Sequence, residues 1–136
     1  MTKQKFLNLI SWIFLGTVLL YFAYAKGWIL AEFDSISPKQ AQEMLKSDKN
    51  VFLLDVRTPE EYSQEFIEGS TLIPVQVLAE NLSKIEQEKN HTIIVYCHSG
   101  NRSVKASRIL HEHGFTPLNL QGGITQWKSE GLPTLQ

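Results

Sequence analysis

The stretch TIIVYCHSGNRS, residues 92–103, carries the strongest structural signal in the sequence. Its first half is rich in β-branched and aromatic residues, which favour a buried strand. A short polar loop with Gly100 follows, and the segment RSVKASRILHEHG, residues 102–114, has the pattern of a helix that ends at Gly114. The sequence therefore predicts a strand that leads through a tight loop into a helix. The only cysteine of the chain, Cys97, lies at that junction.

The same alternation of strands and helices continues on both sides of this stretch. The segment VFLLDV, residues 51–56, is an apolar run typical of a strand buried on both faces of a parallel sheet. Two further helices are expected to begin after the caps Ser37 and Thr58, each of which a proline follows. The remaining expected elements are strands within residues 70–75 and 116–123 and helices over residues 77–85 and 124–131. The pattern predicts an α/β domain with a small, mostly parallel sheet and helices on both faces.

The N-terminal segment FLNLISWIFLGTVLLYFAYA, residues 6–25, contains no charged residue. Twenty helical residues extend about 30 Å, the thickness of the hydrocarbon core of a bilayer. A helix that is apolar on every face does not suit the core of so small a domain. We therefore expect residues 1–30 to form a membrane anchor or a signal segment, followed by one globular domain over residues 31–136.

Two membrane interpretations remain open. In the favoured one, the helix is an uncleaved single-pass anchor in the cytoplasmic membrane. Lys3 and Lys5 then keep the N-terminus cytoplasmic, so that the domain lies on the exported, periplasmic side. In the alternative, the same residues form a signal peptide that is cleaved near Ala25, which releases the domain into the periplasm.

The composition argues against several classes of function. The formal net charge of the chain is −1, and from Ala31 onward ten Lys and Arg residues face fourteen Asp and Glu residues. Nucleic-acid binding is therefore not expected. A single cysteine excludes an intramolecular disulfide. The four histidines, His91, His98, His111 and His113, show no spacing typical of a metal site, and we expect neither a metal nor a cofactor.

Cys97 has the expected surroundings of a reactive thiol. Free backbone N–H groups and the dipole at the start of the following helix point toward it. Gly100 lets the loop curl so that its amides face inward, and Arg102 adds a permanent positive charge. All three effects favour the thiolate, which is the nucleophilic form of cysteine. The alternative is an inert thiol, the last core residue of a strand before an ordinary turn.

Three segments, in order along the chain, resemble motifs of single-domain rhodanese-type sulfurtransferases. The segment LLDVRTPEEY, residues 53–62, resembles the Asp-x-Arg stretch of that family, and CHSGNRS, residues 97–103, resembles its active-site loop. The segment GGITQWKSEGLP, residues 122–133, resembles its closing signature. The resemblance extends over about residues 34–134. One departure is that Phe66 stands where family members often have a histidine.

The resemblance implies a sulfurtransferase that needs no cofactor. Cys97 would take sulfane sulfur from a donor such as thiosulfate, hold it as a persulfide, and pass it to a thiophilic acceptor. Arg102 would attract the anionic donor. Asp55 and Arg57 are expected to form a supporting ion pair that is mainly structural. The implied substrate-binding residues are those of the loop: His98, Ser99, Gly100, Asn101, Arg102 and Ser103.

Two other functions are compatible with the same residues. A Cys-dependent phosphatase or arsenate reductase also places a cysteine before an anion-binding loop and an arginine. In those phosphatases five residues separate the two, whereas four separate Cys97 from Arg102. A membrane-tethered carrier is the second alternative: it would receive a persulfide sulfur from one protein and pass it to another, and small donors would react poorly with it.

Overall fold

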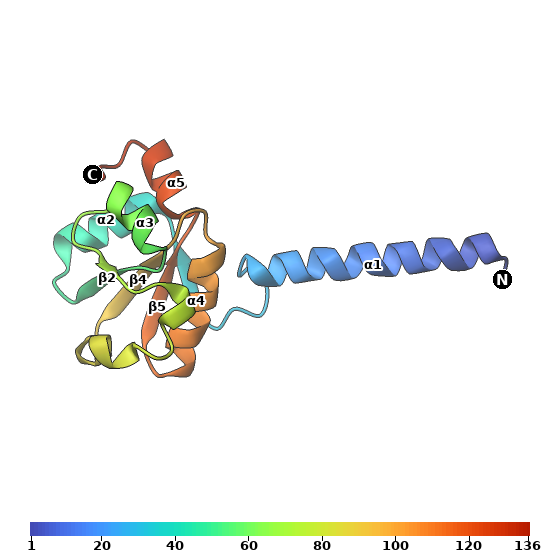
Figure 1. Ribbon diagram of the computed structural model, residues 1–136, viewed down its shortest axis with the longest axis horizontal. Coiled ribbons are helices and arrows are strands. Elements are labelled where there is room, and N and C mark those ends of the chain that lie inside the picture. Colours follow the sequence, from blue (N-terminus) through green and yellow to red (C-terminus); the bar gives the residue numbers. More distant parts are fainter. The chain divides into compact units, whose positions relative to one another are not determined.

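The computed structural model describes residues 1–136 (Figure 1). The chain forms two compact units, Met1–Ala31 and Glu32–Gln136. The first unit consists mainly of one helix, α1 (Lys3–Ala25), which the hydroxyl of Thr2 caps by accepting a hydrogen bond from the backbone N–H of Lys5. No residue of α1 is buried. By length and composition this helix is able to cross a membrane, criteria that a signal sequence near an N-terminus also meets.

The second unit is built on a five-stranded sheet in which every neighbouring pair is parallel. The strand order is β1-β5-β4-β2-β3, so that β4 occupies the centre. The strands are β1 (Asp34–Ile36), β2 (Val51–Asp55), β3 (Thr71–Leu72), β4 (Thr92–Tyr96) and β5 (Thr116–Leu120). The predicted parallel α/β architecture is therefore confirmed. The edge strand β1 is an addition that the sequence pattern did not indicate.

Four α-helices accompany the sheet: α2 (Pro38–Ser47), α3 (Pro59–Gln64), α4 (Asn101–Glu112) and α5 (Gly123–Ser129). The predicted caps at Ser37 and Thr58 are confirmed, and each forms a reciprocal capping box with the side chain three residues on, Gln40 and Glu61 respectively. These caps satisfy backbone donors that have no partner inside the helix.

The predicted helix over residues 77–85 is wrong. The chain instead forms two 3-10 segments, η1 (Val75–Val77) and η2 (Leu82–Glu88), and Ile85 within the second has non-helical dihedral angles. Between the two segments, the side-chain amide of Asn81 donates a hydrogen bond of 2.7 Å to the carbonyl of Val77. Such a local bond competes with continuous helical pairing of the backbone.

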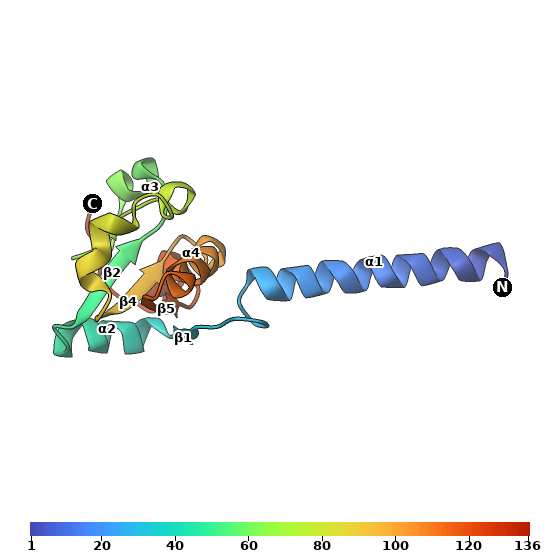
Figure 2. The ribbon, with the colours of Figure 1, turned by 90° about the horizontal axis from the view of Figure 1, so that it is seen from below.

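The helices α2 and α4 lie on opposite sides of the sheet (Figure 2). Because successive side chains of a strand point to opposite faces, the sheet separates two hydrophobic cores. On one face, Ile93 and Val95 pack with Leu110 of α4 and with Leu78 and Ile85. On the other face, Ile94 and Tyr96 pack with Ala41 of α2 and with Ile124 and Trp127 of α5. Both faces of the central strand β4 are therefore covered.

Candidate active site

Cys97 follows the last residue of β4 and its residue surface is only 1% exposed. The backbone N–H of Gly100 donates a hydrogen bond of 3.1 Å to its sulfur. Gly100 has a φ of 108°, a left-handed conformation that glycine adopts without strain, and α4 begins at the next residue. The loop therefore turns an amide toward the sulfur at the N-terminal end of a helix, where a negative charge is stabilised.

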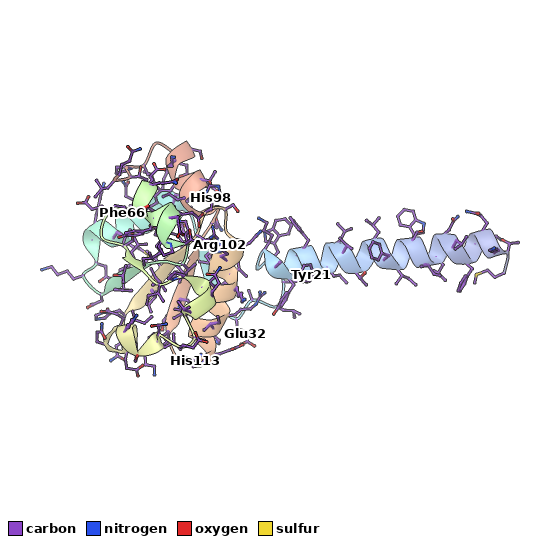
Figure 3. All side chains as sticks on the ribbon, in the orientation of Figure 1. Tyr21, Glu32, Phe66, His98, Arg102 and His113 are labelled. Atoms are coloured by element: carbon purple, nitrogen blue, oxygen red, sulfur yellow. The ribbon has the colours of Figure 1, made fainter.

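The predicted loop residues divide into two groups. Gly100 and Ser103 are buried beside the sulfur, whereas His98, Ser99 and Asn101 are exposed. Arg102, the remaining predicted residue, is half-buried in the first turn of α4; Figure 3 labels it together with His98 of the loop. The imidazole of His98 lies 3.4 Å from the hydroxyl of Thr125. The loop thus offers both a sheltered sulfur and an exposed rim.

A chain of buried polar groups leads away from Cys97. Its thiol donates to the hydroxyl of Ser103 at 3.4 Å, and that hydroxyl donates to the side-chain oxygen of Asn119 at 2.6 Å. The amide nitrogen of Asn119 then donates to Ser35 at 3.3 Å. Sequence reasoning missed Asn119, although a buried asparagine inside the apolar strand β5 is a signal in itself, since buried polar groups need partners.

The glycine pair after β5, Gly122 and Gly123, positions the start of α5 against the loop that follows Cys97. The N–H groups of Ile124 and Thr125, at the start of α5, donate to the carbonyls of Cys97 and His98 at 2.9 and 3.1 Å. A Cβ atom on Gly123 would lie 2.4 Å from the carbonyl oxygen of Cys97. Only glycine allows this approach, so the closing Gly-Gly pair fixes the backbone of the nucleophile loop.

Arg102 is paired with a carboxylate that sequence reasoning did not assign to the site. Its two terminal nitrogens contact the two oxygens of Glu61 at 2.7 and 2.8 Å. The hydrogen bond from Arg102 lowers the pKa of Glu61 from 4.5 to about 2, against a smaller opposing effect of burial. Glu61 belongs to α3, and the spacing of more than forty residues along the chain gave no local signal for the pair.

The ion pair predicted between Asp55 and Arg57 is present and buried, with a shortest distance of 2.6 Å. Arg57 also donates to the carbonyl of Glu65 at 2.7 Å and lies over the ring of Tyr96. Burial lowers the pKa of Arg57, but the hydrogen bond and charge of Asp55 outweigh it and raise the pKa overall. Burial, reinforced by the charge of Asp55, raises the pKa of Tyr96. The pair therefore joins the end of β2 to the segment that follows α3.

A pocket of about 560 Å³ lies at this end of the domain. It contains polar and charged groups from α3, the nucleophile loop and α5. Its lining residues are Arg57, Glu61, Gln64, Glu65, His98, Ile124, Thr125, Lys128 and Gln136. His98 is the loop residue that it shares with the predicted site, while Cys97 lies beneath the loop surface. The pocket thus adjoins the loop of Cys97 at His98.

Phe66, which stands where family members often have a histidine, has a packing role. Its ring stacks on that of Tyr62, with centroids 4.6 Å apart. Its backbone forms two hydrogen bonds with Leu135, at 3.0 and 2.8 Å. The residue therefore ties the segment after α3 to the C-terminal segment and does not approach Cys97 in any contact that the structure records.

The fold and the site together define a class: a parallel α/β domain with a buried cysteine at the carboxyl edge of its sheet. The sequence model of the rhodanese-like domain family matches residues 37–130. The chain belongs to this family, as its resemblance to rhodanese-type proteins indicated.

Individual relatives agree with this assignment. The chain is 33% identical over 101 residues to a sulfurtransferase of Allochromatium vinosum, which covers 74% of this chain and 92% of that protein. It is 39% identical over 71 residues to the thiosulfate sulfurtransferase PspE of Escherichia coli, and this alignment covers 52% of this chain and 68% of that protein. A crystal structure of a rhodanese-related protein from Thermoplasma volcanium matches with a TM-score of 0.69 at 32% identity, over 76% of this chain and 98% of that one.

Some relatives extend beyond this domain. The chain is 32% identical over 117 residues to the putative sulfur carrier protein YrkF of Bacillus subtilis, which is 82% of this chain but 62% of that protein. The relatives together support sulfur transfer as the general activity.

Proposed function

We propose that Cys97 transfers sulfane sulfur from a small donor such as thiosulfate to a thiophilic acceptor through a persulfide. The thiolate attacks the outer sulfur of thiosulfate, the sulfur–sulfur bond of the donor breaks, and sulfite leaves with the electron pair. An acceptor thiolate or cyanide then attacks the outer sulfur of the persulfide, and the Cys97 thiolate leaves. The observation that carries this proposal is the 3.1 Å hydrogen bond from the Gly100 amide to the sulfur.

The surrounding residues fit both half-reactions. The Gly100 amide stabilises negative charge on sulfur before attack and after release. His98, Ser99 and Asn101 form the exposed rim of the loop, over which donor and acceptor approach. The ion pair between Asp55 and Arg57 supports the end of β2, and Arg57 lines the pocket.

The first test is the intact mass of the full chain in detergent before and after exposure to thiosulfate, and again after cyanide. We expect a gain of one sulfur atom that cyanide removes, and no gain in Cys97→Ser. A wild-type chain that stays folded yet takes no sulfur from thiosulfate contradicts transfer from small donors.

A protein-to-protein sulfur carrier is the second candidate. One observation favours it: the basic side chains that line the pocket, Arg57 and Lys128, are each ion-paired, so the pocket has no unpaired cation for a small anion. The similarity to the putative sulfur carrier YrkF adds to this. Loading of Cys97 by a persulfidated protein, with none from thiosulfate, would support the carrier.

Aryl phosphate hydrolysis tests the phosphatase alternative. Arg102, which would have to bind the phosphoryl group, is held by Glu61. We expect the wild type and Cys97→Ser to hydrolyse an aryl phosphate at the same background rate. Efficient hydrolysis that Cys97→Ser abolishes would support the phosphatase.

We also propose that α1 anchors the protein in the cytoplasmic membrane with the catalytic domain on the exported side. The helix has the length and composition to span a bilayer, and the two lysines that precede its apolar part favour a cytoplasmic N-terminus. Membrane fractionation with N-terminal sequencing distinguishes an uncleaved anchored protein from one whose N-terminal segment has been cleaved off as a signal peptide. A mature N-terminus at Lys26 would establish cleavage and contradict the anchor.

A further inference from the structure

The ion pair between Arg102 and Glu61 determines the net charge beside the loop of Cys97. Two parallel contacts of 2.7 and 2.8 Å join the guanidinium to the carboxylate. Such bidentate pairs are the strongest geometry available to arginine and a carboxylate. Because the pKa of Glu61 lies at about 2, the carboxylate stays charged at neutral pH. The positive charge of Arg102 is therefore opposed by a negative charge at contact distance.

Glu61 is held in place by its own helix as well as by Arg102. One carboxylate oxygen accepts the backbone N–H of Thr58 at 3.0 Å, while the Thr58 hydroxyl accepts the N–H of Glu61 at 3.3 Å. This capping box fixes the side chain at the start of α3, so the pair does not depend on a flexible surface side chain.

The pocket that Glu61 lines has a similar balance of charge, although Arg102 itself is not part of its lining. Lys128 contacts the carboxylate of Glu65 at 2.7 Å, and Arg57 contacts that of Asp55 at 2.6 Å. Glu61 and Glu65 both line the pocket. A small dianion that enters the pocket therefore meets two carboxylates and no unpaired arginine or lysine from its lining.

We propose that Glu61 is a specificity-determining residue that selects against small dianionic sulfur donors by neutralising Arg102 beside the nucleophile. The inference rests on the proposed sulfur transfer through Cys97. Thiosulfate then remains a donor, but a disfavoured one, and a persulfide R–S–SH that carries no other negative charge is used in preference to it. In that step the Cys97 thiolate attacks the terminal sulfur, the S–S bond breaks, and R–S⁻ leaves and takes up a proton from water.

The test is Glu61→Gln in the full chain. Glutamine removes the charge but keeps the cap, because α2 of this protein already uses Gln40 at the equivalent position of its capping box. The matched control is Glu60→Gln, an exposed neighbour on the same helix that does not line the pocket. We expect kcat/KM for thiosulfate to rise about three- to tenfold at low salt in Glu61→Gln only, and the gain to shrink at high salt.

A second measurement does not require sulfur transfer. Iodoacetate and iodoacetamide both alkylate a thiolate with loss of iodide, and they differ in charge. We expect the ratio of their rates at Cys97 to shift toward iodoacetate in Glu61→Gln, and to return toward the wild-type value in the double variant Glu61→Gln/Arg102→Gln.

The outcomes separate this inference from the proposed function. An alkylation ratio that Glu61→Gln leaves unchanged, or that Glu60→Gln shifts equally, overturns the inference. If the ratio shifts in Glu61→Gln but no variant acquires sulfur from any donor, the proposed function fails while the electrostatic selection stands. Thermal unfolding of each variant verifies that the compared proteins are folded.

Discussion

At the residue scale, the sulfur of Cys97 lies between two different kinds of partner. The amide of Gly100 donates a hydrogen bond to it from the loop, and the hydroxyl of Ser103 accepts a hydrogen bond from its thiol. The hydroxyl of Ser103 in turn donates a hydrogen bond to the side chain of Asn119 in β5, which is 4% exposed. The side chain of Cys97 is thus oriented by the strand β5, which is remote in sequence, as well as by its own loop.

Asn119 gives a prediction at this scale. Asn119→Asp keeps an oxygen for Ser103 but places a carboxylate in a buried position near Cys97. Because a nearby negative charge disfavours a thiolate, we expect persulfide formation at neutral pH to slow by about tenfold or more. Timed mass spectrometry measures the rate. Asn119→Ala, which adds no charge, is the control, and equal rates in the two variants would refute the electrostatic explanation.

At the scale of elements, two helix N-termini meet at the nucleophile loop. The start of α4 lies beside the sulfur, and the first amides of α5 bind the carbonyls of Cys97 and His98. The Gly122-Gly123 turn, in which both residues have positive φ angles, brings the N–H groups of Ile124 and Thr125 to these carbonyls. The loop is consequently held between helices on opposite faces of the sheet.

Gly123→Ala tests this arrangement. The new Cβ would lie 2.4 and 2.5 Å from the carbonyl oxygens of Cys97 and His98, so the loop has to move. We expect a loss of about 2–4 kcal/mol in the free energy of unfolding and a marked loss of sulfur transfer. Gly69→Ala is a matched control, because Gly69 also has a positive φ but nothing within 4 Å of its Cβ position. Urea unfolding that shows equal losses for both would contradict the contact.

The features predictable from sequence are those with local causes. The caps at Ser37 and Thr58 and the strand before Cys97 follow from short patterns, and they are present. The segment after Pro74 has a helical apolar pattern, but the side chain of Asn81 satisfies the backbone differently. The roles of Glu61 and Asn119 depend on partners 41 and 16 residues away, which no local pattern reveals.

At the scale of the whole molecule, ion pairs contribute to the pH dependence of folding. The pKa of Glu61 is lowered from 4.5 to about 2 in the folded state, chiefly by Arg102. The pKa of Glu65 is lowered as well, first by the hydrogen bond from Lys128. A lowered folded-state pKa means that the group stabilises the fold when it is ionised in both states, above its unfolded pKa.

We therefore expect the contribution of Glu61 to be complete above about pH 4.5 and to be lost as the pH falls toward about 2. Urea unfolding of the wild type and of Glu61→Gln across this range measures it. The difference in free energy of unfolding between the two should be largest near neutral pH and shrink in acid. A difference that is constant over the whole range would show that the pair does not contribute through ionisation.

The pairing of β1 with β5 has a consequence for the order of events during synthesis. β1 is the first strand to leave the ribosome, yet its only neighbour in the sheet is the last strand, with Asp34 opposite Leu118. This side of the sheet therefore stays incomplete until β5 has been made. Contacts so distant in sequence slow folding. A chain that ends before residues 116–120 therefore has no native position for its first strand, although β2, β3 and β4 already have partners in one another.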